Sequence, residues 1–188
     1  MAEECVRDYL LIKPKRLYSP KDNTRYVIPT SAIRDTEKVL TEYARIKPAN
    51  EGLVYWGGIE GGNKIAVQAV IAPRTESDFG RVSTSHRSNF DFVRTLNRHN
   101  LVQVAQVHSH PSDWVDHSPG DDALAAFKTE GLLSIVVPDY CNRGMLPLTA
   151  CGIHRYTRGD FIRLSNKYID SHFVIRNPPS SYLEDFRK

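Results

Sequence analysis

Residues 108–121 read HSHPSDWVDHSPGD, and this stretch decides both the expected fold and the expected chemistry of the chain. His108 and His110 are two positions apart, and Ser118 and Asp121 follow after a gap of seven residues. Side chains at i and i+2 of a strand point to the same face, so both imidazoles can reach one ion. With Asp121 as third ligand, a tetrahedral Zn²⁺ keeps one open position, as catalytic zinc sites do. We therefore predict one zinc ion per chain, held by His108, His110 and Asp121.

The residues on either side of the histidines support this geometry. Residues 101–107 (LVQVAQV) are rich in β-branched side chains and predict a largely buried strand that ends at the histidines. Pro111 cannot continue a strand and turns the chain away. Ser118 at the N-cap, Pro119 at the first turn and an acidic residue at N3 predict a helix start, with helix-forming residues as far as Phe127. We expect the metal between the strand end and the start of this helix.

A simpler interpretation remains open for single residues of the stretch. Ser118 and Asp121 can each be explained as helix caps alone, and a His-Pro turn at a strand end is common without any metal. Packing alone rarely places so many polar groups beside a buried strand, because each of them needs a partner. For His117, inside the same loop, we expect a residue with no role, and a contact with substrate is the alternative.

The spacing His108-x-His110, seven residues, Ser118-x-x-Asp121 resembles the signature of the JAMM (JAB/MPN+) metalloproteases, in particular their prokaryotic JAB branch. The family pattern also contains a glutamate before an aliphatic strand that ends in glycine. Glu51 in residues 51–58 (EGLVYWGG) fits, although Val54 stands where the family often has glycine. Glu60 is the rival, and we expect it to be exposed in a hairpin turn. The resemblance covers roughly residues 31–165.

This resemblance implies an α/β fold, the JAB/MPN domain, which is similar to cytidine deaminases and has a mixed sheet flanked by helices on both faces. It also implies that Glu51 is the general base and that the Ser118 hydroxyl stabilises the oxyanion. Two imidazoles and one carboxylate leave the ion a good Lewis acid for hydrolysis. Deaminase chemistry is not expected, because the Cys-x-x-Cys pair of the zinc deaminases is absent.

The function implied by the resemblance is a zinc-dependent isopeptidase or peptidase, similar to deubiquitinases, which cleaves after the C-terminus of a ubiquitin-like protein. The expected partners are that protein and its conjugates, with activating and conjugating enzymes of a bacterial pathway such as an antiviral defence operon. A hydrolase acting on a sulfur-carrier protein adduct is an alternative. A non-catalytic MPN-type scaffold is another, but such relatives generally lose the metal ligands that this chain retains.

Composition agrees with one compact enzyme domain. The chain has 188 residues, 40% of them hydrophobic, and a net charge of only +3, so no nucleic-acid partner is expected. No signal peptide or bilayer-spanning stretch is expected either. Three cysteines, Cys5, Cys141 and Cys151, are expected to be free thiols, because their spacing to His154 does not suit a second zinc site. These features together predict a reducing, cytoplasmic location without membrane attachment.

The remaining chain is expected to divide into residues 1–30, an N-terminal hairpin or extension, residues 31–165, the metalloprotease domain, and residues 166–188, a C-terminal tail. Thr30 or Ser31 should cap a helix with an apolar stripe that reaches Ile46. Residues 73–86 and 138–147 should be irregular loops, at places where family members clamp a substrate tail. The other expected elements are a helix over 89–98 and strands over 52–56, 64–71, 132–137, 149–156 and 160–164.

Overall fold

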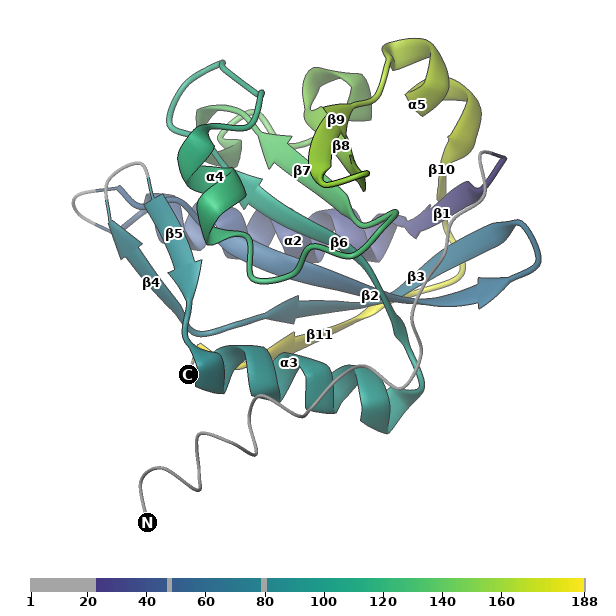
Figure 1. Ribbon diagram of the computed structural model, residues 1–188, viewed down its shortest axis with the longest axis horizontal. Helices are drawn as coiled ribbons and strands as arrows, with labels where there is room; N and C mark the ends of the chain where they lie inside the picture. Colours follow the sequence, from purple (N-terminus) through teal and green to yellow (C-terminus); the bar gives the residue numbers. More distant parts are fainter. Residues whose placement is uncertain (1–22, 47–48, 79–80, 188) are drawn as a thin grey trace.

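The computed structural model describes residues 23–46, 49–78 and 81–187, and its centre is one large mixed β-sheet (Figure 1). The strand order is β10-β1-β3-β2-β6-β7-β8-β9, and β11 lies beside another part of β3. The strands are β1 (Arg25–Pro29), β2 (Leu53–Gly61), β3 (Lys64–Ala72), β6 (Val102–Ser109), β7 (Leu133–Val137), β8 (Gly152–Thr157), β9 (Asp160–Arg163), β10 (Phe173–Arg176) and β11 (Tyr182–Asp185). The expected α/β class with a mixed sheet is thus confirmed.

Two helices cover opposite faces of the sheet. Alternate residues of a strand point to opposite faces. Val54 and Trp56 of β2 pack in the cluster that includes α2 (Thr30–Ala44), whereas Leu53 and Tyr55 pack in the cluster that includes α3 (His86–His99). Figure 1 shows α2 and α3 on opposite sides of β2 and β3. Helices on both faces, as expected, bury the centre of the sheet, and β6 therefore has no exposed face along most of its length.

The first helix differs from the expectation at both ends. Its N-cap is Pro29 rather than Thr30 or Ser31, because those two hydroxyls bond to the C-terminal part of the chain: Thr30 to the Arg176 carbonyl and Ser31 to Ser181. The apolar stripe is buried as expected up to Tyr43. Ile46 lies beyond the last helical residue, Ala44, and is exposed, so its place in the stripe was wrong.

The loop expected over residues 73–86 is instead a hairpin, which corrects the prediction. Strands β4 (Thr75–Asp78) and β5 (Arg81–Thr84) pair antiparallel, with Thr75 opposite Thr84. The hairpin forms a two-stranded sheet that is separate from the main sheet. Its strands are therefore mostly polar and lack the apolar pattern by which a strand is recognised in a sequence. Ser85 then caps α3 by accepting from the Ser88 amide, so the helix begins three residues before the expected start.

Helix α4 (Pro119–Leu124) is shorter than expected. It does not continue to Phe127, because Ala125 leaves the helical region and Phe127 packs against Tyr55 and Phe92 on the α3 side of the sheet. Likewise, residues 148–150 form a short 3₁₀ helix, η2 (Leu148–Ala150), where the expected strand would begin. In both places a tertiary contact or turn overrides local preference.

The C-terminal residues that were expected as a tail contribute to the main sheet. After α5 (Asn166–His172), β10 pairs parallel with β1 and β11 pairs parallel with β3. Stacking of Phe173 on Tyr26, with ring centroids 4.6 Å apart, closes this side. Of the expected N-terminal hairpin, residues 25–29 form β1, and the partner arm at residues 16–19 lies outside the described residues.

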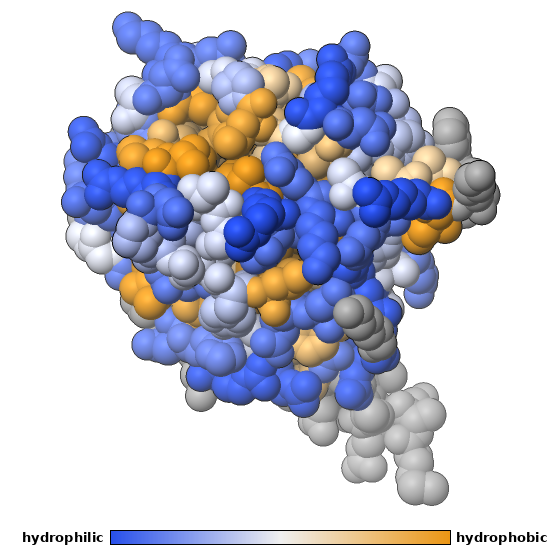
Figure 2. Space-filling view, turned by 180° about the vertical axis from the view of Figure 1, so that it is seen from behind, coloured by the Kyte–Doolittle hydropathy of each residue, from blue (hydrophilic) through white to orange (hydrophobic). Residues whose placement is uncertain are grey.

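The surface is largely polar. Figure 2 shows that apolar side chains on the rear face gather in separate patches between hydrophilic ones. Among the described residues the large apolar side chains most exposed to solvent are Ile46, Ile59, Trp114, Leu146, Ile162 and Tyr182. None of the helices in the described ranges combines the length and the apolar character that a membrane crossing would require.

Candidate metal centre

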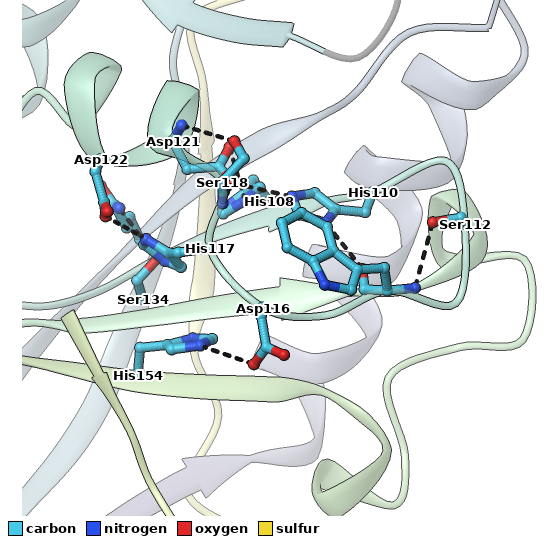
Figure 3. Close-up of polar contacts among 12 residues, drawn as sticks. His108, His110, Ser112, Asp116, His117, Ser118, Asp121, Asp122, Ser134 and His154 are labelled. Atoms are coloured by element: carbon cyan, nitrogen blue, oxygen red, sulfur yellow. Dashed lines mark hydrogen bonds and ion pairs between the residues drawn. The ribbon is translucent and has the colours of Figure 1, made fainter.

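The structure brings His108, His110 and Asp121 together at the end of β6 (Figure 3). The two Nε2 atoms lie 3.2 Å apart, His108 Nε2 is 3.6 Å from Asp121 Oδ1, and His110 Nε2 is 3.3 Å from Asp121 Oδ2. Four ligands placed tetrahedrally at 2.0–2.1 Å from a zinc ion lie roughly 3.3 Å from one another. The three side chains therefore already have the mutual spacing that one tetrahedral ion requires, and they could hold a metal ion.

Strand pairing on both sides fixes the position of the histidines. His108 lies opposite Leu53 of β2 and Val136 of β7, and the His110 amide donates to the Val137 carbonyl. The His110 ring is also oriented, because its Nδ1 faces the Trp114 carbonyl at 2.9 Å. A carbonyl can only accept, so Nδ1 carries the proton and Nε2 keeps its lone pair for a metal. Metal-binding histidines usually have such a partner on the second nitrogen.

Asp121 is held by the cap of its own helix. Ser118 Oγ accepts from the Asp121 amide at 3.0 Å, and Asp121 Oδ2 accepts from the Ser118 amide at 2.7 Å, which together form a capping box. The two readings of these residues are therefore compatible, since the carboxylate caps the helix and faces the histidines at once. Ser118 accepts the amide with its oxygen and retains a hydroxyl proton that it can donate.

Glu51 is buried next to this centre. It is 3% exposed, and its Oε2 atom has no hydrogen-bond partner among the described residues. The neighbouring Gly52 fixes its place: the Gly52 amide donates to Ser109 Oγ at 3.0 Å and its carbonyl accepts from the Ser109 amide at 3.1 Å. Ser109 thus has a structural role, because it holds the backbone next to Glu51. An unpartnered buried carboxylate oxygen beside three potential ligands fits a site that takes up an ion and water.

Glu60, the rival for the role of base, lies far from the centre. It pairs with Ile65 near the opposite end of β2, within the strand rather than in the turn. The structure therefore places Glu51, and not Glu60, beside the three potential ligands.

Electrostatics favour a neutral His108 and an ionised Asp121, whereas at His110 burial lowers the pKa but hydrogen bonds to Asp121 and to the Trp114 carbonyl outweigh it and raise that pKa in the metal-free site. Burial lowers the pKa of His108 to about 3 against the opposing charge of Asp121, so its imidazole is neutral at pH 7. Burial also acts to raise the pKa of Asp121, but hydrogen bonding to His110 and the neighbouring His108 outweigh it and lower that pKa well below the usual range. Burial raises the pKa of Glu51 to about 7, the range in which a carboxylate can both accept and release a proton.

The loop between the histidines and α4 is fastened to the strands beneath it. Val115 lies so close to Gly152 of β8 that a Cβ at this glycine would be 1.8 Å from the Val115 carbonyl oxygen. Asp116 accepts from Arg163 at 2.5 Å and faces His154 Nε2 at 3.6 Å. His154 is therefore a buried partner of this loop and not a ligand of the metal centre (Figure 3).

Three neighbouring residues were not predicted from the sequence. The half-exposed Trp114 stacks on the His110 ring, with centroids 5.3 Å apart. Ser134 of β7 bonds to His117 at 2.7 Å. Tyr140, in a left-handed backbone conformation, donates its amide to the His110 carbonyl at 2.7 Å. For Trp114, its closeness to the histidines in sequence is a signal that could have predicted the contact. The contacts of Ser134 and Tyr140 depend on tertiary structure and have no such signal.

A small pocket of about 30 Å³ adjoins the metal centre. His108 and Asp121 line it together with residues of β5 and of the end of α4. Its apolar and polar lining residues are Leu53, Tyr55, Val82, Ser83, Thr84, Gln106, Leu124, Ala125 and Ala126. The pocket admits only a small group next to the candidate ligands.

Cys141 and Cys151 are free, as expected, and both are buried, whereas Cys5 lies outside the described residues. In the described ranges, the group His108, His110 and Asp121 is the one that has a geometry suited to a metal.

Comparison with known proteins gives a partial likeness. No family model matches the chain. Over 95 residues it is 31% identical to the protein named Probable metalloprotease y4jG from Sinorhizobium fredii, a match that covers 48% of this chain and 58% of that protein. The chain thus spans little more than half the length of this curated relative.

Among solved structures, the fold is similar to that of protein DSY2949 from Desulfitobacterium hafniense, which was determined in solution. The TM-score is 0.54, the identity is 18%, and the match covers 80% of this chain and 92% of the other. At this level of identity the likeness concerns the fold alone.

Proposed function

We propose that this protein is a zinc metallopeptidase of the JAMM type, which cleaves an amide or isopeptide bond at the C-terminus of a ubiquitin-like protein. The observation that carries the proposal is the triangle of His108, His110 and Asp121, with edges of 3.2–3.6 Å, beside the buried and unpartnered Glu51 carboxylate. The metalloprotease relative supports the reaction class. The ubiquitin-like substrate rests on the motif resemblance alone.

In this proposal, different residues bind the metal, transfer the proton and stabilise the oxyanion. His108, His110 and Asp121 would hold a zinc ion, which would supply the Lewis acidity that acidifies water and polarises a carbonyl. Glu51 accepts the proton of the attacking water on its carboxylate and then passes it to the nitrogen of the leaving amine, so that the proton balance closes. The Ser118 hydroxyl donates to the developing oxyanion, because its oxygen is already occupied as a helix cap.

The small pocket beside the centre is consistent with a thin, extended substrate. An extended peptide can be held as an added strand along an unpaired strand edge, and β5, which contacts α4, pairs with β4 alone among the described strands. The pocket of about 30 Å³ between them would exclude large side chains next to the scissile bond. The glycine-rich ends of ubiquitin-like proteins meet this requirement.

In this proposal the enzyme processes a precursor or reverses conjugation in a bacterial pathway, together with activating and conjugating enzymes, as in antiviral defence operons. Hydrolysis of an adduct on a sulfur-carrier protein is the alternative substrate class. The retained ligand set and the buried Glu51 favour an enzyme over a non-catalytic scaffold.

The proposal is tested with an aminocoumarin amide attached to the C-terminus of a ubiquitin-like protein. We expect the zinc-loaded protein to release the fluorophore and phenanthroline to stop the release. Glu51→Gln should keep zinc bound but lose activity by about 10²–10⁴-fold, the usual contribution of a general base. Glu60→Gln, at the other end of β2, should leave the rate unchanged. Full activity of Glu51→Gln, or cleavage that survives removal of zinc, would refute the mechanism.

A further inference from the structure

The helix that carries Asp121 is too short to hold itself in place. Helix α4 has six residues, and none of them is buried. Isolated helices of this length are unstable in water, and most helices in proteins are stabilised by packing of an apolar face. Asp121 nevertheless has to stay within 3.3–3.6 Å of two histidines on another element. Its position therefore depends on contacts with neighbouring elements, among them β5.

His117 makes such a contact. Its Nδ1 atom is 2.8 Å from Asp122 Oδ1 on α4, and its Nε2 atom is 2.7 Å from Ser134 Oγ on β7 (Figure 3). The side chain is only 5% exposed. Its ring lies between neighbours, with centroids 4.6 Å from His154 and 4.5 Å from Phe161. The imidazole thus joins the residue next to Asp121 to a central strand, which corrects our expectation of a loop residue with no role.

The hydrogen bonds along this connection have a consistent direction. The Asp122 carboxylate accepts from Nδ1, and in the tautomer with its proton on Nδ1 the ring presents Nε2 as an acceptor to the Ser134 hydroxyl. The Gln106 side-chain amide in turn donates to Ser134 Oγ at 3.1 Å. Serine, imidazole and carboxylate stand in the order found in serine hydrolases. Ser134 is 0% exposed, however, so it cannot reach a substrate, and the arrangement is suited to holding a helix rather than to nucleophilic attack.

We propose that Asp122, His117 and Ser134, here named the His117 clamp, position Asp121 for metal binding by anchoring α4 to β7. This inference rests on the proposed function, because it assigns the clamp to the zinc site of that enzyme. Outer-shell partners of metal ligands typically change metal affinity by about 10–100-fold when they are removed. The clamp acts through Asp121, and its residues are positioning residues.

Zinc affinity measured by competition with a chromophoric chelator tests the clamp. Asp122→Ala and Ser134→Ala each remove one hydrogen bond of the clamp, and we expect a loss of about 10-fold or more in zinc affinity for each. Asp122→Asn retains an acceptor oxygen for His117 Nδ1 and should bind zinc like the wild type. The matched control is Asp113→Ala in the same loop, which removes a carboxylate that is 81% exposed and paired with Arg143.

A second measurement does not need the metal. In the zinc-free protein, hydrogen exchange of the Asp122 and Ala125 amides, which bond to Ser118 and Asp121 within α4, should be faster in Asp122→Ala than in Asp122→Asn or in Asp113→Ala. If wild-type protein binds zinc and all four variants bind it equally, the clamp is refuted while the proposed function stands. If wild-type protein binds no zinc, the proposed function fails. In that case unchanged exchange in Asp122→Ala also refutes the clamp, whereas faster exchange supports its anchoring of α4.

Discussion

At the scale of single residues, Asp121 serves two purposes with one carboxylate. It accepts from the Ser118 amide within the capping box and faces the Nε2 atoms of both histidines. The helix cap and the metal site thus both require a carboxylate at position 121. For this reason the sequence alone could not decide whether Asp121 is a cap, a metal ligand or both. A substitution that keeps the cap but removes the charge can separate the two purposes.

We predict that Asp121→Asn preserves the cap and loses the metal. Its amide oxygen can still accept from the Ser118 amide, so the thermal stability of the zinc-free protein should stay close to that of the wild type. Asp121→Ala loses the cap as well, which costs about 0.3–1.5 kcal/mol. Both variants should lose more zinc affinity than the 10–100-fold typical of outer-shell changes. Calorimetry and chelator competition measure the two effects, and wild-type zinc affinity in Asp121→Asn would exclude Asp121 as a ligand.

The spacing of residues 108–121 was sufficient to predict which three side chains the fold brings together. Strand and cap geometry follow from local rules, so this part of the site could be read from the sequence. His117 and Ser134 could not be paired in this way, because they are 17 residues apart and meet only when β7 lies beside β6. The position of Tyr140 could not be predicted either, because its left-handed backbone conformation is usually indicated by a glycine and none stands at this position.

At the scale of elements, the metal loop depends on the close approach of Val115 to β8. Gly152 leaves no room for a side chain at this contact, because its Cβ would lie 1.8 Å from the Val115 carbonyl oxygen. The loop continues directly into Asp116 and His117, which bond to β9 and β7. A change at Gly152 should therefore be transmitted to α4 and to Asp121.

We predict that Gly152→Ala destabilises the protein and weakens zinc binding. Relief of the overlap has to shift the loop, and overpacking of this kind typically costs about 1–3 kcal/mol. Gly61→Ala is the matched control, because a Cβ there meets no atom within 4 Å. Denaturant unfolding and zinc titration of both variants check the prediction. Equal behaviour of Gly152→Ala and the wild type would show that the loop is not held at this point.

Element boundaries were predicted well where burial dictates the pattern and poorly where it does not. The β-branched run before His108 became β6, buried throughout. The β4–β5 hairpin was missed because its residues are mostly polar and its two strands pair with each other rather than with a strand of the main sheet. The end of α4 was missed because Phe127 leaves the helix to pack on Tyr55, a contact that no local preference encodes.

At the scale of the whole molecule, β10 extends the sheet beyond β1 at one edge, β11 pairs with β3, and the metal centre lies at β6, near the middle of the strand order. The sequence predicted the α/β class but assigned residues from 166 onward to a tail. Short strands of four residues each, β10 and β11, carry too little periodic pattern for recognition. Their places depend on β1 and β3, which are distant in sequence.

Two thiols, those of Cys141 and Cys151, are buried in the hydrophobic core. Burial raises the pKa of Cys141 and of Cys151 to about 12, with a further contribution from the Glu37 carboxylate. The thiolate is the reactive form, so both should resist alkylation at pH 8 in the native protein and react once it is unfolded. Peptide mass spectrometry after iodoacetamide treatment measures this. Rapid labelling of either cysteine under native conditions would contradict the packing described here.

The most direct test of the whole account is the metal content of the purified protein and of a variant that lacks one ligand. Native mass spectrometry, supported by elemental analysis, should find one zinc ion per chain in the wild type. Treatment with a chelator should remove it, and His110→Ala should not retain it. A wild-type protein without stoichiometric metal, or a His110→Ala variant that keeps the ion as tightly as the wild type, would contradict the central claim.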